Sequence, residues 1–164
     1  MKTFRYALIL ALALATVAFA DQTVAQKQFD TMKTLVGSWE GKTNDGRSVQ
    51  VKFRVTANGS ALVSEIGGKE DMLTMVNLDR DRLLLTHYCS AGNQPRMKAS
   101  ASPDGKTITF DFVDATNLAS PADDHMQRVT FFFTDPNHHA EEWVFSKDGK
   151  EFRERFELER KSTV

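Results

Sequence analysis

Residues 47–56 read RSVQVKFRVT, and this stretch decides the fold. Apolar side chains occupy every second position from Val49 to Val55, and polar side chains fill the positions between them. Successive side chains of a β-strand point to opposite faces, so the alternation predicts a strand with one buried face and one solvated face. The residues NDG at 44–46 and NG at 58–59 predict a tight turn on either side, because Asn, Asp and Gly tolerate positive φ.

Nine further segments have the same short, apolar character and are separated by turn signals at intervals of roughly 8–12 residues. These segments are residues 37–43, 60–66, 70–79, 82–90, 94–102, 107–114, 126–134, 139–146 and 151–160. Their connections are short, which favours antiparallel neighbours, and a closed barrel leaves no exposed strand edge. The sequence therefore predicts an all-β fold, an antiparallel up-and-down barrel of about ten strands.

One helix is predicted before the strands, over residues 24–36. Phe29, Met32, Leu35 and Val36 recur with helical spacing and share one face, and Gly37 ends the segment. We expect this short N-terminal helix to cap one end of the barrel.

The first 20 residues, MKTFRYALILALALATVAFA, have the pattern of a secretory signal peptide. A basic start precedes an apolar run that is shorter than the roughly 20 residues of a membrane span, and Ala18-Phe19-Ala20 is a small-residue cleavage signal. We expect cleavage between Ala20 and Asp21, a periplasmic or secreted protein, one domain over residues 21–164, and no stable membrane insertion.

The chain after Ala20 holds 19 basic and 22 acidic residues, for a net charge of −3. It contains no block of five or six basic residues, so nothing in the sequence favours nucleic acid as a partner. Cys89 is the sole cysteine, which excludes a disulfide within the chain. Because an unpaired cysteine usually behaves as a small apolar residue, we expect Cys89 to be buried and inert.

The stretch LVGSWEGK at 35–42 resembles the Gly-x-Trp signature of the lipocalin and wider calycin group. In that group the tryptophan packs across the closed end of the barrel beneath the capping helix, which implies structural roles for Gly37 and Trp39. A large ring at that position would also bury much apolar area. Together with HYC at 87–89 and GNQPRM at 92–97, the motif resembles a group of bacterial secreted lipocalin-like proteins of unknown function.

The opening Gly37, Trp39 and Gly41 is also similar, more distantly, to that of nitrobindin, a ten-stranded haem barrel. Nitrobindin holds its haem through a histidine near the C-terminus. The last predicted strand here, residues 151–160, contains no histidine, and His138 and His139 lie earlier, beside a Pro-Asn turn. This difference from nitrobindin disfavours haem binding, and no cofactor is predicted.

The stretch THYCSAGNQPRM at 86–97 is the main candidate for a ligand site. Two orientations of its first strand are open, since either Leu83, Leu85, His87 and Cys89 or Leu84, Thr86 and Tyr88 face the interior. Pro95 cannot donate a ladder hydrogen bond, so a bulge or a rim position is expected there. The hypothesis is that polar side chains orient an apolar or amphipathic small molecule in an apolar cup. The residues concerned are His87, Tyr88, Gln94, Arg96 and Met97.

Two further charges interrupt apolar faces and complete the predicted site. Arg128 lies among Met126, Thr130 and Phe132, and Glu154 lies among Phe152, Phe156 and Leu158. An inward charge is costly unless it is paired. We therefore expect Arg128 and Glu154 to meet inside the barrel, together with Glu65, or else to reach solvent near strand ends.

Three other interpretations stay open. His87 and Cys89 are two residues apart on a strand, roughly 6–7 Å, which is loose for a thiolate–imidazolium pair, so an enzyme is disfavoured. The histidines at 125, 138 and 139 adjoin acidic residues, but adjacent strand residues point oppositely, so solvated loop positions are expected and no metal is predicted. The last alternative is a ligand-free structural or interaction module whose barrel is filled by its own side chains.

Overall fold

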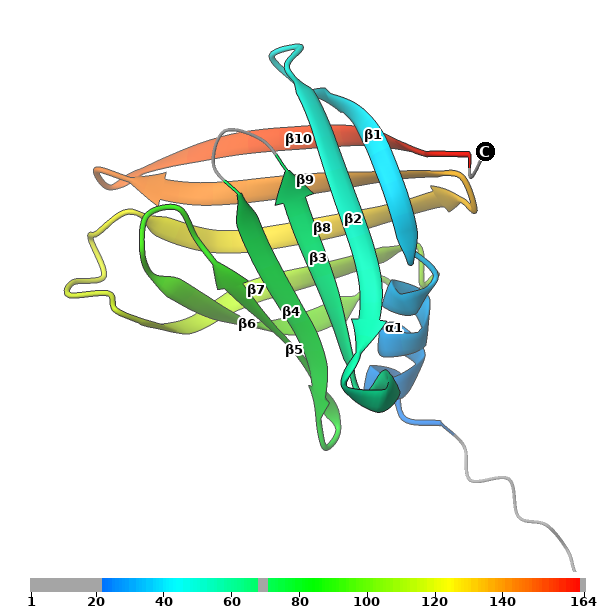
Figure 1. Ribbon diagram of the computed structural model, residues 1–164. Helices are drawn as coiled ribbons and strands as arrows, with labels where there is room; N and C mark the ends of the chain where they lie inside the picture. The colour runs from blue at the N-terminus through cyan, green and yellow to red at the C-terminus, as the bar shows by residue number, and fades with distance from the viewer. Residues whose placement is uncertain (1–21, 68–70, 163–164) are drawn as a thin grey trace, which may run out of the picture.

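The computed structural model describes residues 22–67 and 71–162 (Figure 1). The predicted signal peptide lies outside the described residues. The elements follow the chain in the order α1 (Val24–Lys33), β1 (Gly37–Thr43), β2 (Ser48–Thr56), η1 (Ala57–Gly59), β3 (Ala61–Gly67), β4 (Met72–Asp79), β5 (Arg82–Tyr88), β6 (Gln94–Ala101), β7 (Thr107–Thr116), β8 (His125–Asp135), β9 (His138–Lys147) and β10 (Lys150–Arg160).

The ten strands form one closed antiparallel barrel in which each strand pairs with its neighbours in the chain. The barrel closes where β1 pairs with β10, from Trp39 opposite Arg160 to Thr43 opposite Phe156. The up-and-down barrel and its capping helix are therefore confirmed. In Figure 1 strands β2–β4 run steeply across the view, whereas β8–β10 run almost level behind them.

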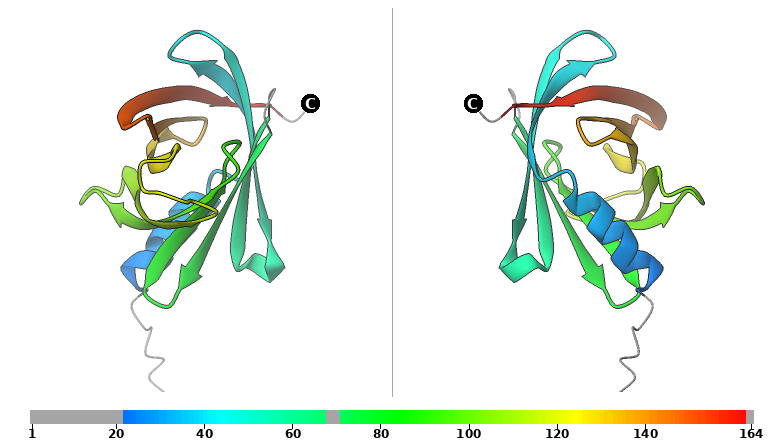
Figure 2. Two further views of the ribbon diagram at one scale, coloured as in Figure 1. Left: turned by 90° about the vertical axis from the view of Figure 1, so that its left-hand side faces the viewer. Right: turned by 90° about the vertical axis from the view of Figure 1, so that its right-hand side faces the viewer.

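Helix α1 lies across one end of the barrel, which we call the helix end (Figure 2, right). The side chain of Thr23 caps its first turn by accepting a hydrogen bond from the backbone N–H of Gln26, at 3.1 Å. Phe29 and Met32 are buried against the barrel, as the helical spacing predicts. The helix stops at Lys33, three residues before the predicted end, because a turn to the first strand occupies 34–36.

Trp39 joins the helix to the closure of the barrel. Its indole Nε1–H donates a hydrogen bond to the carbonyl of Leu35 at 2.7 Å, and its buried ring lies under the guanidinium of Arg160, at 4.1 Å. The same guanidinium donates hydrogen bonds to the carbonyls of Thr34, Val36 and Pro136. The chain entering β1, the end of β10 and the β8–β9 turn are thereby held together.

Large side chains fill the barrel from the helix end to its middle. Trp39, Trp143 and Phe53 form this packing together with Phe110, Phe131, Met97, Leu62, Leu83 and Leu85, all of which are fully buried. The rings meet mostly edge to face, as between Phe110 and Phe131, which is a favourable geometry for aromatic pairs. The predicted cup therefore does not extend through this part of the barrel.

Gly41 in β1 offers a direct test of the closure. A Cβ at this position would lie 1.8 Å from the backbone carbonyl oxygen of Glu157, so β10 would have to move. We expect Gly41→Ala to lower the free energy of unfolding by about 1–3 kcal/mol, as for other overpacked sites, measured by urea denaturation. Gly67→Ala is the control, since the nearest atom to its Cβ is 3.9 Å away. Equal stability of the two variants would contradict this account of the closure.

Candidate functional site

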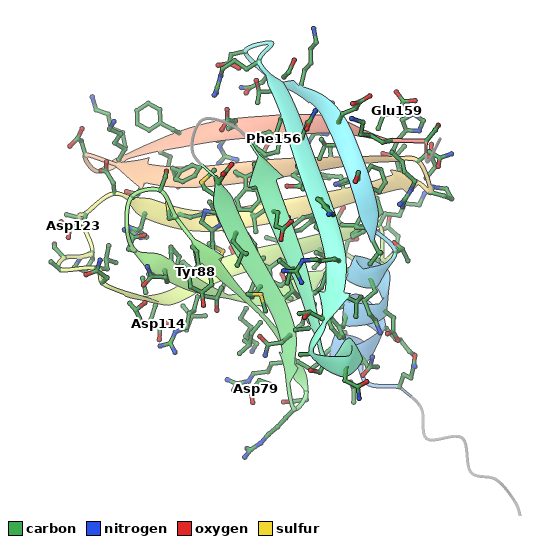
Figure 3. All side chains as sticks on the ribbon, viewed as in Figure 1. Asp79, Tyr88, Asp114, Asp123, Phe156 and Glu159 are labelled. Carbon is green, nitrogen blue, oxygen red and sulfur yellow. The ribbon has the colours of Figure 1, made fainter. Side chains whose placement is uncertain are left out.

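The end of the barrel opposite the helix holds a cavity of about 410 Å³, which we call the mouth cavity. Alternate connections of an up-and-down barrel gather at one end, and the β1–β2, β5–β6, β7–β8 and β9–β10 connections all contribute to it. Figure 3 shows Asp123, on the β7–β8 connection, at the opposite end of the molecule from Glu159. The lining residues are Asn44, Asp45, Arg47, Cys89, Ser90, Ala91, Asp124, His125, Phe145, Ser146, Lys147, Phe152, Arg153 and Glu154.

Two aromatic side chains give the mouth cavity its apolar surface. Phe145 and Phe152 pair directly across β9 and β10 and therefore lie side by side. The side chain of Phe152 is 54% exposed, whereas Phe145 is half-buried, so part of this apolar surface faces solvent. Cys89, also in the lining, is buried at the end of β5 as predicted.

Charged side chains surround this apolar surface, and most of them are paired. Arg47 on the β1–β2 connection forms ion pairs with Asp45 and Glu154. Hydrogen bonds from Thr43 and then Arg47 lower the pKa of Asp45 to about 2, so this carboxylate is ionised at neutral pH. Lys147 differs from these residues, since it forms no ion pair within the described residues.

Hydrogen bonds between connections hold one side of the mouth cavity in place. The Asn93 side chain donates to the carbonyl of Asp124 at 2.7 Å, and the Asn117 side chain donates to the carbonyl of Gly92 at 2.7 Å. The carboxylate of Asp124 also accepts from the backbone N–H of Asp148, at 3.2 Å. The β5–β6, β7–β8 and β9–β10 connections are thus tied to one another around the cavity.

His87 lies deeper than the mouth cavity and is fully buried, with 0% exposure. Its Nδ1 is hydrogen-bonded to Thr74 at 2.9 Å, its ring packs against Trp143, and its Nε2 has no partner among the described residues. Burial lowers the pKa of His87 to about 4, because desolvation penalises the charged imidazolium. The ring is therefore neutral in the folded protein at neutral pH.

A second buried polar group lies on β9, where the sequence predicted solvated histidines. His139 Nε2 bonds the carboxylate of Glu141 at 3.1 Å, and Trp143 donates to the other carboxylate oxygen at 2.9 Å. His139 and Glu141 are both fully buried, and His125 is buried at the start of β8. The prediction was therefore wrong for His139 and His125 and right for the exposed His138. Among residues 22–67 and 71–162, no group of three or more potential ligands is placed to hold a metal ion.

The structure decides which face of β5 points inward. Leu83, Leu85 and His87 are buried, whereas Tyr88 is 47% exposed and lies on the outer face. Of the two orientations that the sequence left open, the one with His87 inward is therefore observed. Tyr88 does not join it, because neighbouring side chains of a strand point to opposite faces.

The other predicted site residues are dispersed. Met97 is fully buried in the core, and Gln94 bonds the carbonyl of Gly92 and the hydroxyl of Thr116 at the β5–β6 connection. A bulge between Arg96 and Met97 agrees with the disruption expected near Pro95. These positions do not form the polar cluster that the sequence suggested.

Of the two alternatives for Arg128 and Glu154, the one in which they meet inside the barrel is not observed. Arg128 is exposed and pairs with Asp111 on the neighbouring strand, and Arg96 is exposed and pairs with Asp114. Glu65 pairs with Arg54. Glu154 alone of these residues lines the mouth cavity, where it pairs with Arg47.

Glu154 is the one lining residue of the mouth cavity that was predicted as a site residue, so the others, among them Arg47, His125, Phe145, Lys147 and Phe152, were missed. A usable signal was present, because every second connection of a meander must lie at the same end of a barrel. Grouping the connections in this way would have brought together the residues beside the turns at 44–46, 89–93, 117–124 and 147–149.

A larger hollow, of about 490 Å³, lies beside β1–β4 and Lys161. Its charged lining residues include Lys52, Glu65 and Lys161, and the last two form ion pairs with Arg54 and Glu40. The mouth cavity is the stronger candidate despite its smaller volume, since it combines adjacent aromatic rings with a buried histidine.

Solved structures with the same fold include two that differ strongly from this chain in sequence. One is a protein of unknown function from the DUF3598 family of Nostoc punctiforme, with a TM-score of 0.55 and 11% identity. The match covers 79% of this chain but 48% of that protein, so this chain spans about half its length. The other is Rv2717c of M. tuberculosis, with a TM-score of 0.55, 14% identity and coverage of 82% of this chain and 98% of that one.

These likenesses show the fold alone, a ten-stranded barrel. No family model and no curated protein matches the sequence. The specific relation to lipocalins stays a prediction. Within the described part of the chain, no helix has the length and apolar character that crossing a membrane requires.

The lowered pKa of His87 predicts a specific pH dependence of stability. The unfolded imidazole has a pKa near 6.5, so between about pH 6.5 and 4 the unfolded chain binds a proton that the folded protein does not. The free energy of unfolding should therefore fall by about 3 kcal/mol as the pH drops through this window. Urea denaturation at several pH values should show a smaller fall for His87→Leu. His138→Leu, which removes an exposed imidazole, should show the same fall in the free energy of unfolding as the unaltered protein. If the fall were lost in His138→Leu and kept in His87→Leu, its assignment to His87 would be wrong.

Proposed function

We propose that this protein binds a small apolar or amphipathic molecule in the mouth cavity. The observation that supports the proposal most strongly is the pairing of Phe145 and Phe152 in the wall of a 410 Å³ cavity, with the ring of Phe152 half exposed. Ligand cavities of this size combine apolar walls with a few polar groups that orient the ligand. The apolar part of the ligand contacts the two rings in this proposal.

The charges at the rim favour an amphipathic ligand over a purely apolar one. Arg47, Arg153 and Lys147 line the cavity together with Asp45, Asp124 and Glu154, so the two signs are balanced in number. Lys147 is the cation of this set that no described carboxylate neutralises. A polar or anionic group of the ligand would find its counter-charge there, at the solvent side of the cavity.

The packed interior limits how deep the ligand goes. His87, Trp143 and Phe131 occupy the middle of the barrel, and each is fully buried. The ligand therefore lies at the end of the barrel and not along its axis. The sequence suggested a ligand site deep inside the barrel, whereas this proposal places the ligand at its end. The type of ligand, an apolar or amphipathic small molecule, is the same. The prediction that binding needs no haem is untested and stays a prediction.

A fluorescent probe tests the proposal directly. We expect 1-anilinonaphthalene-8-sulfonate to bind the protein with increased fluorescence, and Phe152→Ala to weaken its binding about fivefold, because a lost ring contact of roughly 1 kcal/mol corresponds to that factor. Tyr88→Ala is the matched control, since it removes an aromatic ring of similar exposure from the outer face. If both variants bound the probe like the unaltered protein, the mouth cavity would not be the site.

We also propose that the protein acts outside the cytoplasm, on the basis of the predicted signal peptide. Expression of the full chain in a Gram-negative host should place the mature protein in the periplasm or medium, with Asp21 as its first residue. N-terminal sequencing of the purified protein measures this. Recovery of the chain from the cytoplasm with its first 20 residues intact would contradict the proposal.

A further inference from the structure

His125 is the one histidine in the lining of the mouth cavity, and its tautomer is set by its surroundings. It is the first residue of β8 and is 3% exposed. Its Nδ1 lies 2.6 Å from the carbonyl oxygen of Asp123. A carbonyl oxygen can only accept a hydrogen bond, so Nδ1 must carry the proton. In the neutral ring, Nε2 therefore holds the lone pair.

The ring of His125 is held in one position. Phe112 packs against it with ring centroids 4.8 Å apart, and the hydrogen bond to the carbonyl of Asp123 fixes its orientation. Nε2 has no hydrogen-bond partner among the described residues, and it is not one of the polar atoms sealed from solvent, unlike Nε2 of His87. A fixed acceptor is thus left accessible on a ring that lines the cavity.

Two carboxylates that line the cavity are also acceptors. Glu154 is a half-buried carboxylate, and the carboxylate of Asp124 already accepts one backbone hydrogen bond. The cationic donors are on long side chains, and two of them, Arg47 and Arg153, are occupied by ion pairs. A ligand that enters with a carboxylate foremost would meet a lone pair and further negative charge.

We propose that Nε2 of His125 accepts a hydrogen bond from the inner end of the ligand. This inference rests on the proposed function and names its ligand class: small aromatic or aliphatic molecules that carry a hydroxyl group on an apolar body. The hydroxyl donates to His125, the apolar body contacts Phe145 and Phe152, and any anionic group points outward to Lys147. His125 is then a specificity-determining residue, because it distinguishes a hydroxyl from the corresponding ether.

Two matched probes and three variants test the inference. The probes are 1-naphthol and 1-methoxynaphthalene, which share an apolar body and differ in the donor. His125→Asn keeps a donor where Nδ1 is and removes the acceptor, whereas His125→Gln places an acceptor near Nε2. His138→Asn removes an exposed imidazole outside the cavity and is the control. Displacement of 1-anilinonaphthalene-8-sulfonate gives the two dissociation constants for each protein.

The quantity to compare is the preference for naphthol over its methyl ether. We expect this preference to fall about 3- to 10-fold in His125→Asn, as for the loss of one neutral hydrogen bond. It should be retained in His138→Asn and largely retained in His125→Gln. If the preference were the same in His125→Asn as in the unaltered protein, the inference would be wrong although the cavity binds ligands. If neither naphthalene bound the unaltered protein, the proposed function itself would fail, and the inference with it.

A measurement on the unaltered protein covers the case in which a variant does not fold. In the neutral ring, the ¹⁵N resonance of His125 Nε2 should be that of an unprotonated nitrogen, and it should move when 1-naphthol is added. Addition of 1-methoxynaphthalene should leave the resonance nearly in place. An Nε2 that already carries the proton, or one that responds equally to both probes, would overturn the assignment.

Discussion

The pairing of β1 with β10 is the contact on which the rest of the structure depends, because it turns a ten-stranded meander into a barrel. Gly41 allows the two strands to approach, since a side chain there would collide with the carbonyl of Glu157. Trp39 then links the closure to the helix through the carbonyl of Leu35, and Arg160 covers its ring. Once β1 and β10 are joined, no strand edge of the barrel stays open, and the helix has a fixed end of the barrel to cover.

Closure at the helix end also determines where a ligand can bind. The aromatic rings that stabilise the barrel occupy its centre together with two separate buried polar groups, His87 bonded to Thr74, and Glu141 bonded to His139 and Trp143. Space for a small molecule is left at the other end of the barrel, where loops connect the strands. The mouth cavity is thus a consequence of packing: the barrel is filled from the helix end to its middle, and the opposite end holds the cavity.

The sequence predicts the structure best for features that depend on a single strand, such as the residues at which the strand begins and ends. The predicted bounds of β1 are those observed, and those of β2 differ by one residue, because period-two alternation is a local property of the backbone. The predicted and observed positions of charged side chains differ, because those positions depend on ion-pair partners on other strands. Arg96 and Arg128 were candidates for ligand binding because their ion-pair partners, Asp114 and Asp111, belong to another strand and could not be identified from the sequence. His139 looked solvated because a turn adjoins it, yet its strand begins at once and carries it into the core.

The sequence by itself therefore determined the class of the fold, the number of strands and the capping helix, because these follow from side-chain periodicity and turn residues. Only the tertiary structure decided which face of β5 is interior, which charges are paired, and that His125 meets Phe145 and Phe152 in one cavity. The physical reason is that strand register and barrel closure bring together residues far apart in the chain. Nothing in the pattern of a single strand records which residue of another strand lies opposite.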